Sequence, residues 1–361
     1  MLNICLTYDY ELFLGKNNDS SEAILFAPTR ALADMMASKN VSGVFFADVC
    51  SVFAHEKYGL HEYCNNFKRQ LQYLSENGHD VQLHIHTNWL KSVRVGDEIE
   101  LTNEGYRIHD FSFDVLAENS VQKIVHNTKE YLERVCREVV PSYKCIAYRA
   151  GGFALQPESE ILKCIRNEGI IIDSSVVPRL RNISGENYFD FSKVPNKLNW
   201  WMEPEKGITV SVPKSDYTIY ELPVASLKPR LFECLFMDKD DLHLPFAKVK
   251  KGEYIKTQKA SKIRGRISRT YHALFDYRYI SLDTKNYKAV MKDLEYIYKK
   301  YKLHKNDATV ALIAHPKLAD DIRVNNIANL IDMVSRFPEK YRFTNCMDLY
   351  KYLQINEGVK K

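Results

Sequence analysis

The stretch Asn77-Gly78-His79-Asp80-Val81-Gln82-Leu83-His84-Ile85-His86-Thr87-Asn88-Trp89 is the part of the sequence that best indicates the fold. Gly78 is expected to end a helix, and apolar and polar residues then alternate from Val81 to His86 in the pattern of a β-strand. This alternation places His84 and His86 on one face at the end of the strand. Two imidazoles there can share Zn²⁺ or a similar divalent ion. The alternative is an ordinary surface strand that carries polar side chains.

The first strand that the sequence predicts, Leu2 to Glu11, also ends in polar residues. Asp9 and Glu11 are two positions apart and therefore lie on the same face of that strand. A pair of carboxylates facing a pair of histidines suggests that one acid binds a metal ion while the other acts as a base on its water. The alternative is a strand that simply runs out into solvent.

Composition limits the class of protein. The 361 residues are 45% hydrophobic and show no internal repeat, so we expect one domain over residues 1–361 with an irregular insertion on the substrate side at about 178–277. The eight cysteines are scattered without C-x-x-C spacing, which is typical of reduced core residues. Neither a signal peptide nor an apolar run of membrane-spanning length is recognisable, so we expect a cytoplasmic protein. A net charge of +5 is too mild to predict a nucleic-acid binder.

Apolar strands alternate with amphipathic helices along the chain. The run Val44–Ala47 is typical of a buried parallel strand, and residues from Val121 to Val135 have the spacing of an amphipathic helix. This alternation predicts parallel strands joined by helices, an arrangement in which the active site lies at the C-terminal ends of the strands.

Three later strands also end in residues suited to catalysis. Arg149 closes one of them ahead of a glycine pair and is expected to pair with Asp9, although a surface arginine is the alternative. Asp173 ends the next apolar run as a candidate orienting residue. His315 ends the last one and is a candidate general acid, with Asp173 expected to hold its other ring nitrogen.

A basic stretch runs from Lys248 to Arg269, where nine lysines and arginines accompany the single acid Glu253. It could meet an anionic polysaccharide, a sugar-nucleotide phosphate or a membrane surface, and a solvated face is the alternative. Trp200-Trp201 is a second candidate contact, because aromatic faces commonly stack on sugar rings. Buried packing is the equally plausible explanation for these tryptophans.

Together these segments resemble the polysaccharide deacetylase family, that is, the NodB-homology domain of carbohydrate esterase family 4. The resemblance is carried by six segments: Thr7-Tyr8-Asp9-Tyr10-Glu11, Val44-Phe45-Phe46, Gly78-His79-Asp80-Val81-Gln82-Leu83-His84, Tyr148-Arg149-Ala150-Gly151-Gly152-Phe153, Asp173-Ser174-Ser175 and Leu312-Ile313-Ala314-His315-Pro316. It extends over most of the chain and indicates a divergent member of the family.

The resemblance implies a distorted (β/α)7 barrel and the metal-dependent removal of an acetyl group from a sugar. The residues implied to be catalytic are Asp9, Arg149, Asp173 and His315. The implied ligands of a divalent metal ion, expected to be zinc, are Glu11, His84 and His86. The implied substrate contacts are Trp89, Tyr148, Gly151, Gly152 and Phe153.

Two positions depart from the family pattern. Tyr10 separates the two acids of the first motif, and Asn88 stands where the second metal-binding histidine usually lies, so His86 is the expected replacement. We expect an N-deacetylase of surface polysaccharide biosynthesis whose substrate is an N-acetylated sugar, lipid-linked or nucleotide-linked. Peripheral membrane contact through Lys248–Arg269 is expected and nucleic-acid binding is not. The alternatives are a noncatalytic carbohydrate-binding relative that has lost the metal and, third, a nucleic-acid contact through the basic stretch.

Overall fold

The structure is a computed structural model that describes residues 1–96, 98–102, 104–183, 188–228, 252–254 and 277–355. Part of the insertion expected at about 178–277 lies outside these ranges. The basic stretch Lys248–Arg269 lies outside them too, apart from the backbone of a short strand. The expected membrane contact therefore stays a prediction.

The centre of the main sheet is β1 (Leu2–Tyr10), whose nine residues are all buried. It pairs in parallel with β3 (Gly43–Asp48) through Leu6–Tyr10 and with β16 (Ala308–Ala314) along most of its length. Its first three residues also pair with β17 (Tyr341–Phe343). A strand that has neighbours on both edges and no exposed residue is expected to be mainly apolar, and before Asp9 this one contains only Asn3 and Thr7 as polar residues.

The sheet continues from β3 through β4 (Asp80–Ile85), β7 (Ala147–Ala150), β8 (Ile172–Asp173) and β12 (Ile219–Glu221). All the pairings in the order β12-β8-β7-β4-β3-β1-β16 are parallel, which makes seven parallel strands in the described part of the chain.

The two ends of this sheet meet. Directly after β12, Val224 forms a parallel bridge with Ala311 of β16, which closes the sheet. The fold is thus the predicted α/β class, a distorted (β/α)7 barrel, and that prediction is confirmed. The segment expected to be an insertion contributes β12 to this barrel, together with β11 (Trp200–Met202), which pairs antiparallel with β12.

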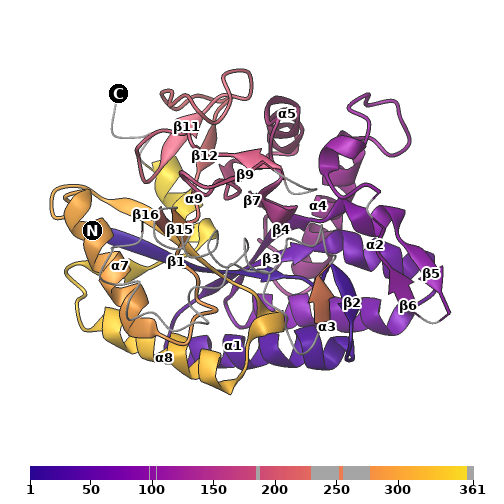
Figure 1. Cartoon of the computed structure of the whole chain (residues 1–361), viewed down its shortest axis with the longest axis horizontal. Helices are drawn as coiled ribbons and strands as arrows, with labels where there is room; N and C mark the ends of the chain where they lie inside the picture. Colours follow the sequence, from indigo (N-terminus) through magenta and orange to yellow (C-terminus); the bar gives the residue numbers. More distant parts are fainter. Residues whose placement is uncertain (97, 103, 184–187, 229–251, 255–276, 356–361) are drawn as a thin grey trace, which may run out of the picture.

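Helices surround the strands and form the outer layer of the molecule (Figure 1). They are α1 (Ala27–Ser38), α2 (Val49–Lys57), α3 (His61–Glu76), α4 (Val121–Arg137), α5 (Ser159–Asn167), α7 (Tyr287–Lys300), α8 (Asp321–Ser335) and α9 (Cys346–Ile355). Side-chain caps define where three of them begin, because Ser120, Asn286 and Asp320 each accept a hydrogen bond from a backbone N–H of the first turn.

The amphipathic helix predicted near residues 121–135 is α4. The apolar face expected from the sequence is buried along its length, including Val121, Ile124, Leu132 and Val135, and Thr128 on the same face satisfies its hydroxyl with backbone carbonyls. A stripe of this spacing must face the sheet, since burial of the apolar side chains is what stabilises such a helix.

Short elements connect the barrel strands at its rim. The short strands are β2 (Gly15–Asn17), β5 (Val93–Val95), β6 (Glu98–Glu100), β9 (Arg181–Asn182), β10 (Phe189–Asp190), β13 (Ser226–Leu227), β14 (Gly252–Tyr254) and β15 (Arg278–Tyr279). Glu22–Phe26 forms a π-helix, and single 3₁₀ turns cover Thr87–Lys91, Ile108–Asp110, Gly151–Phe153 and Pro316–Leu318. The region from Lys91 to Asn119, expected to be a long loop, contains the β5–β6 hairpin.

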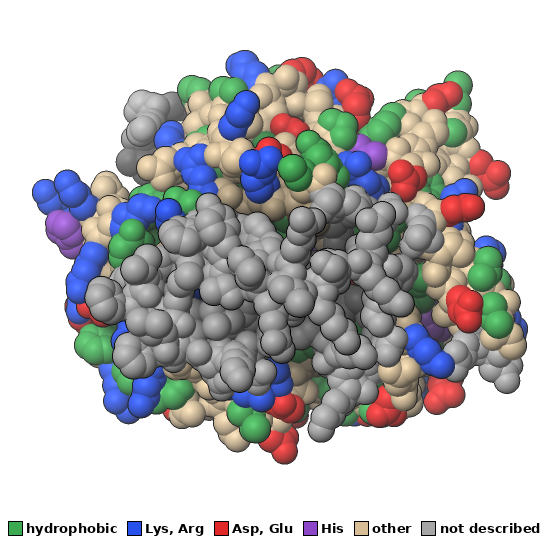
Figure 2. Space-filling model, viewed as in Figure 1, with side chains coloured by type: hydrophobic (Ala, Val, Ile, Leu, Met, Phe, Trp, Pro, Cys, Tyr) green, Lys and Arg blue, Asp and Glu red, His purple; other side chains and the backbone are tan. Residues whose placement is uncertain are grey.

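Many lysine and arginine side chains lie on the surface (Figure 2). Lysine and arginine side chains gather along the edge of the molecule where α7 lies (Figure 2).

The cysteines that the structure describes are all buried and form no disulfides, as predicted. None of the described helices combines the length and the apolar character needed to cross a bilayer.

Candidate active site

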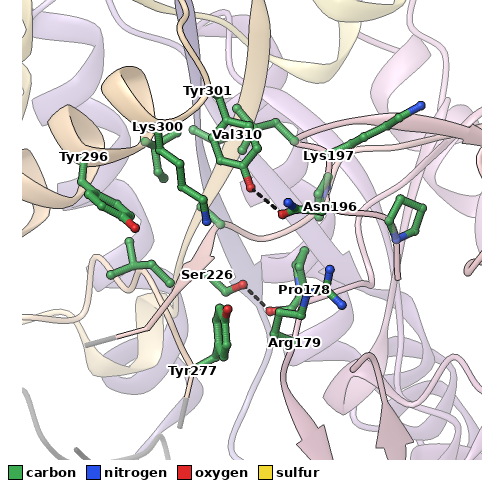
Figure 3. Close-up of a pocket in the computed structure, with 16 residues that line it drawn as sticks. Pro178, Arg179, Asn196, Lys197, Ser226, Tyr277, Tyr296, Lys300, Tyr301 and Val310 are labelled. Carbon is green, nitrogen blue, oxygen red and sulfur yellow. Dashed lines mark hydrogen bonds between the residues drawn. The ribbon is translucent and has the colours of Figure 1, made fainter. Parts of the chain in front are cut away.

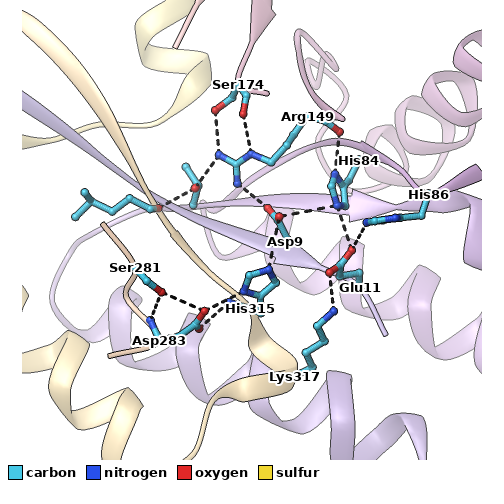
Figure 4. Close-up of polar contacts among 12 residues, drawn as sticks. Asp9, Glu11, His84, His86, Arg149, Ser174, Ser281, Asp283, His315 and Lys317 are labelled. Atoms are coloured by element: carbon cyan, nitrogen blue, oxygen red, sulfur yellow. Dashed lines mark hydrogen bonds and ion pairs between the residues drawn. The ribbon is translucent and has the colours of Figure 1, made fainter. Parts of the chain in front are cut away.

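The acids of β1 and the histidines of β4 converge at the C-terminal ends of their strands (Figure 4). Glu11 Oε2 lies 3.2 Å from His84 Nε2 and 2.5 Å from His86 Nε2. Asp9 Oδ2 lies 3.9 Å from the same nitrogen of His84. The predicted meeting of Asp9 and Glu11 with His84 and His86 is confirmed, because the period of two places both members of each pair on the inner face.

Three of these side chains fit a divalent metal ion. One ligand atom from each of Glu11, His84 and His86 lies within 4.8 Å of the others, and all three residues are buried. His84 Nδ1 is 2.8 Å from the backbone carbonyl of Arg149, to which its N–H donates, and its Nε2 forms a hydrogen bond of 3.2 Å with Glu11, so Nε2 is the nitrogen that would bind an ion in place of a proton. One carboxylate and two neutral imidazoles are a typical ligand set for zinc with a position left open for water.

Asn88 does not belong to this group of ligand atoms. It lies in the 3₁₀ turn Thr87–Lys91, fully buried, and its amide nitrogen and oxygen have no hydrogen-bond partner among the described residues. His86, two positions earlier, provides the second imidazole, as the sequence predicted.

Asp9 is held by Arg149. The Arg149 side chain is fully buried, and its Nη1 donates to Asp9 Oδ1 over 2.6 Å. Its other N–H groups donate to Thr7 Oγ1, to Ser174 Oγ and to the Ser174 carbonyl, and the guanidinium carbon lies 4.2 Å from the centroid of the Phe46 ring. The predicted Arg149–Asp9 pair is therefore confirmed.

Burial raises the pKa of the Asp9 carboxyl, but the charge of Arg149 and of the neighbouring histidines lowers it below the ordinary value. Burial likewise raises the pKa of Glu11, whereas Lys317 and the two histidines lower it well below its usual range. Both carboxyls are thus ionised at neutral pH and aimed into the same space.

His315 faces Asp9 from the end of β16. Its Nε2 lies 3.8 Å from Asp9 Oδ2, while its Nδ1 lies 2.9 Å from Asp283 Oδ2. The backbone N–H of His315 also donates to Asp283 Oδ1. Burial lowers the pKa of His315, but the charge and the hydrogen bond of Asp283 raise it above the ordinary value.

The prediction that Asp173 holds His315 is wrong, because Asp283 occupies that position. Asp173 accepts a hydrogen bond from Ser175 Oγ and stands opposite Glu221 in the register of β8 and β12. Burial raises the pKa of Glu221 well above its usual range, and the adjacent Asp173 carboxyl raises it further. Asp173 therefore belongs to a buried acid pair beside the site, not to the His315 contact.

Two residues of the site were missed by the sequence analysis. Asp283 lies in the segment between β15 and α7, where no strand pattern marks it. Lys317 follows the His315-Pro316 pair, and its buried ammonium donates to Glu11 Oε1 over 2.6 Å. Its position two residues beyond a strand-end histidine was the available signal, but lysines there usually reach solvent.

The residues expected to contact substrate fall into two groups. Trp89 is 2% exposed and Tyr148 is 1% exposed, so both are buried like the site residues themselves, and their contact with substrate stays a prediction. Tyr148 precedes the inward-facing Arg149 on β7, and the alternation of a strand turns it to the other face. Gly151, Gly152 and Phe153 are partly exposed in the turn after β7, and their contact with substrate stays a prediction.

A glycine is required at position 151 by close packing. A Cβ there would lie 2.5 Å from the carbonyl oxygen of Ile85 and 2.6 Å from His86 Nδ1. Gly152 follows with a φ of 56°, in the left-handed region that glycine adopts without strain. The glycine pair therefore lets the turn after β7 pass directly against a histidine of the site.

A separate hollow lies between α7 and the segment around residues 195–198 (Figure 3). Cations and tyrosines share its lining, among them Arg179, Lys300 and Tyr301. No residue of the Asp9 and Glu11 site lines it, and we assign it no role.

Comparison with known proteins identifies the fold. No family model and no curated protein matches the sequence. Among solved structures, the chain is similar to a protein of Parabacteroides distasonis assigned as a glycoside hydrolase/deacetylase, with a TM-score of 0.50 and 12% identity, over 95% of this chain and 68% of the other. The chain shares the barrel fold of that structure.

Two further solved structures that are similar to this chain are assigned as polysaccharide deacetylases. The one from Mycobacterium smegmatis has a TM-score of 0.48 and 12% identity, over 99% of this chain and 91% of the other. The one from Pseudomonas aeruginosa PAO1 has a TM-score of 0.46 and 11% identity, over 97% of this chain and 89% of the other.

The site at the ends of the barrel strands combines three chemical capabilities. A carboxylate and two imidazoles can hold a divalent ion, a second carboxylate is kept ionised by a buried guanidinium, and a third imidazole is oriented by its own acid. This is the combination that metal-assisted hydrolysis requires: a Lewis acid, a base and an acid that face one volume.

Proposed function

We propose that the protein is a divergent polysaccharide deacetylase that removes the acetyl group from an N-acetylated sugar with the help of a divalent ion, zinc being the ion proposed. The observation that supports this most is the convergence of Glu11, His84 and His86 beside the Arg149–Asp9 pair. The fold supports it as well, since it is shared with a protein assigned as a glycoside hydrolase/deacetylase.

In this proposal Asp9 is the base. Its carboxylate, kept ionised and aimed by Arg149, takes a proton from the water that attacks the acetyl carbonyl carbon. A divalent ion held by Glu11, His84 and His86 would polarise that carbonyl and stabilise the negative charge that develops on its oxygen.

His315 is the acid of the same reaction. Its Nε2 faces Asp9 and the reaction volume, and Asp283 fixes the N–H on Nδ1. The protonated imidazole gives its proton to the nitrogen as the bond between carbon and nitrogen breaks. Acetate and the free amine of the sugar are the products.

The direct test measures acetate released from N-acetylglucosamine oligomers, free N-acetylglucosamine and UDP-N-acetylglucosamine, with zinc and with a chelator. We expect zinc-dependent release that Asp9→Asn abolishes while zinc binding persists. A metal-loaded, folded protein that releases no acetate from any of these substrates would refute the proposal. UDP-N-acetylglucosamine is included because a nucleotide-linked or lipid-linked sugar of surface polysaccharide biosynthesis is the finer form of the proposal.

A second candidate function is that of a noncatalytic carbohydrate-binding relative, which Asn88 favours because it stands where the resembled family has a histidine ligand. Metal analysis separates the two functions. About one zinc ion per chain that is lost in His84→Ala supports the enzyme, whereas a metal-free protein that binds sugar supports the second candidate.

A further inference from the structure

Lys317 is a buried lysine inside the site (Figure 4). Its side chain is 1% exposed, and its Nζ donates to Glu11 Oε1 over 2.6 Å and to the Leu12 carbonyl over 3.1 Å. The ring of Phe13 lies beneath the ammonium, with 5.3 Å between Nζ and the ring centroid. Lysine is almost never fully buried unless it is paired, so this pairing is a specific feature of the site.

The two oxygens of Glu11 face different partners. Oε1 meets the ammonium of Lys317, and Oε2 meets His84 Nε2 and His86 Nε2. An ion bound by the two imidazoles would therefore meet Oε2, while Oε1 is already engaged on the other side of the carboxylate.

We propose that Lys317 is a positioning residue that divides the two oxygens of Glu11: its ammonium holds Oε1, leaves only Oε2 for the metal ion, and by its positive charge weakens the affinity of the site for that ion. This inference rests on the metal site of the proposed function, and it assigns a role that the resemblance does not imply.

The direction of the effect follows from charge. Groups that hydrogen-bond a metal ligand usually raise its basicity, because they are carbonyls or carboxylates, and their loss weakens metal binding about 10- to 100-fold. An ammonium does the opposite, since it withdraws negative charge from the carboxylate and repels the incoming cation in a poorly solvated site. In the metal-free protein the same ammonium compensates a buried carboxylate that would otherwise be costly.

Lys317→Met tests this, because it keeps the length of the side chain and removes the charge. We expect the dissociation constant for zinc, measured by competition with a chelating dye, to fall about tenfold. We also expect the thermal midpoint of the metal-free protein to fall and the rise on adding zinc to become larger. Zinc affinity that is unchanged or weaker in Lys317→Met overturns the proposal.

Arg278→Met is the matched control. The Arg278 guanidinium forms an ion pair of 2.7 Å with the buried Asp293, away from the site. We expect this variant to lower the thermal midpoint without changing the affinity for zinc. A tenfold gain in affinity here as well would overturn the proposal, because the effect would then not be specific to Glu11.

A double-mutant cycle with Glu11→Gln tests the pair itself. In the metal-free protein, Lys317→Met should lower the midpoint much less when Glu11 is already neutral. An equal loss in both backgrounds overturns the pairing. If Lys317→Met does not fold, Lys317→Gln carries the same prediction, because it keeps a donor for Oε1 and removes the charge.

Neither measurement depends on deacetylation. A protein that releases no acetate but gains zinc affinity in Lys317→Met retains this inference and loses the proposed function. An active deacetylase whose affinity does not change retains the function and loses the inference. Zinc bound by Lys317→Met but not by the unaltered protein supports the inference, and zinc bound by neither overturns it.

Discussion

Asp283→Asn tests which acid holds the general acid of the site. Asp283 Oδ2 accepts from His315 Nδ1 and Oδ1 accepts from the backbone N–H of His315, each over 2.9 Å. The asparagine side chain has the same shape but only one oxygen. One of the two N–H donors of His315 must therefore face the NH₂ group of the variant, where no acceptor is present.

The expected loss in the free energy of unfolding follows from the contact between Asp283 and His315. A hydrogen bond to a charged partner contributes about 1.5–3 kcal/mol net, and the side chains of His315 and Asp283 are only 13% and 18% exposed, so solvent screens the pair little. Burial lowers the pKa of His315 but Asp283 raises it, and the net shift is upward. The stabilisation is therefore complete below the unfolded pKa of about 6.5 and is lost as pH rises through the raised pKa.

Urea denaturation of the metal-free protein at pH 5.5 and pH 9 measures this difference, and an NMR titration of His315 measures its pKa. We expect Asp283→Asn to lower the free energy of unfolding by about 1.5–3 kcal/mol at pH 5.5 and by clearly less at pH 9. We also expect the substitution to lower the pKa of His315. Asp173→Asn is the matched control, since it makes the same chemical change at a buried acid that contacts Ser175. The reasoning fails if Asp173→Asn lowers the pKa of His315 as much, or if Asp283→Asn costs the same at both pH values.

Three further predictions concern neighbouring residues. Arg149→Met should lower the free energy of unfolding by about 3–5 kcal/mol, measured by urea denaturation at pH 7, because it leaves the Asp9 carboxylate buried without its cation. Burial raises the pKa of Asp9 but Arg149 lowers it, so this cost should vanish as pH falls through the lowered pKa, and a constant cost would contradict the pairing. Gly151→Ala should lower the free energy of unfolding by about 1–3 kcal/mol and weaken zinc binding, because the new Cβ would displace the His86 ring. Unchanged zinc binding would contradict this prediction. Tyr148→Phe should leave the KM for the N-acetylated sugar unchanged, because the alternation of β7 turns that buried side chain away from Arg149, and a raised KM would establish it as a substrate contact.

The central part of the site could be predicted from the sequence because it obeys a simple period. Asp9 and Glu11, and His84 and His86, are two residues apart at the ends of apolar strands, and parallel strands in a barrel bring such ends together. The Arg149 contact followed from the same rule, since it also closes a strand. These predictions needed no knowledge of the connecting segments.

The contacts that were missed depend on those segments. Asp283 reaches His315 because the segment before α7 runs along β16, where Ser281 bridges Ile313, and no periodic pattern in the sequence shows this. Asp173 does end a strand, but its side chain lies beside Glu221 and not beside His315. Strand order alone does not say which side chains meet at the same depth of the barrel.

Lys317 was missed for an energetic reason. Its burial depends on the ion pair with Glu11, which lies 306 positions earlier in the chain. Propensity and hydrophobic patterns are local quantities, so they cannot report a charge whose compensation comes from so distant a segment.

The position of β1 has a consequence for how the protein is made. The strand that carries Asp9 is synthesised before the other strands of the barrel, yet one of its edges pairs with Ala308–Ala314, which is synthesised after them. A nascent chain that ends before β16 leaves one edge of the buried strand β1 without its partner. It also leaves Asp9 without His315 and Glu11 without Lys317. Synthesis must therefore pass β16 and Lys317 before the active site can assemble, and a fragment that ends before β16 should be prone to aggregate.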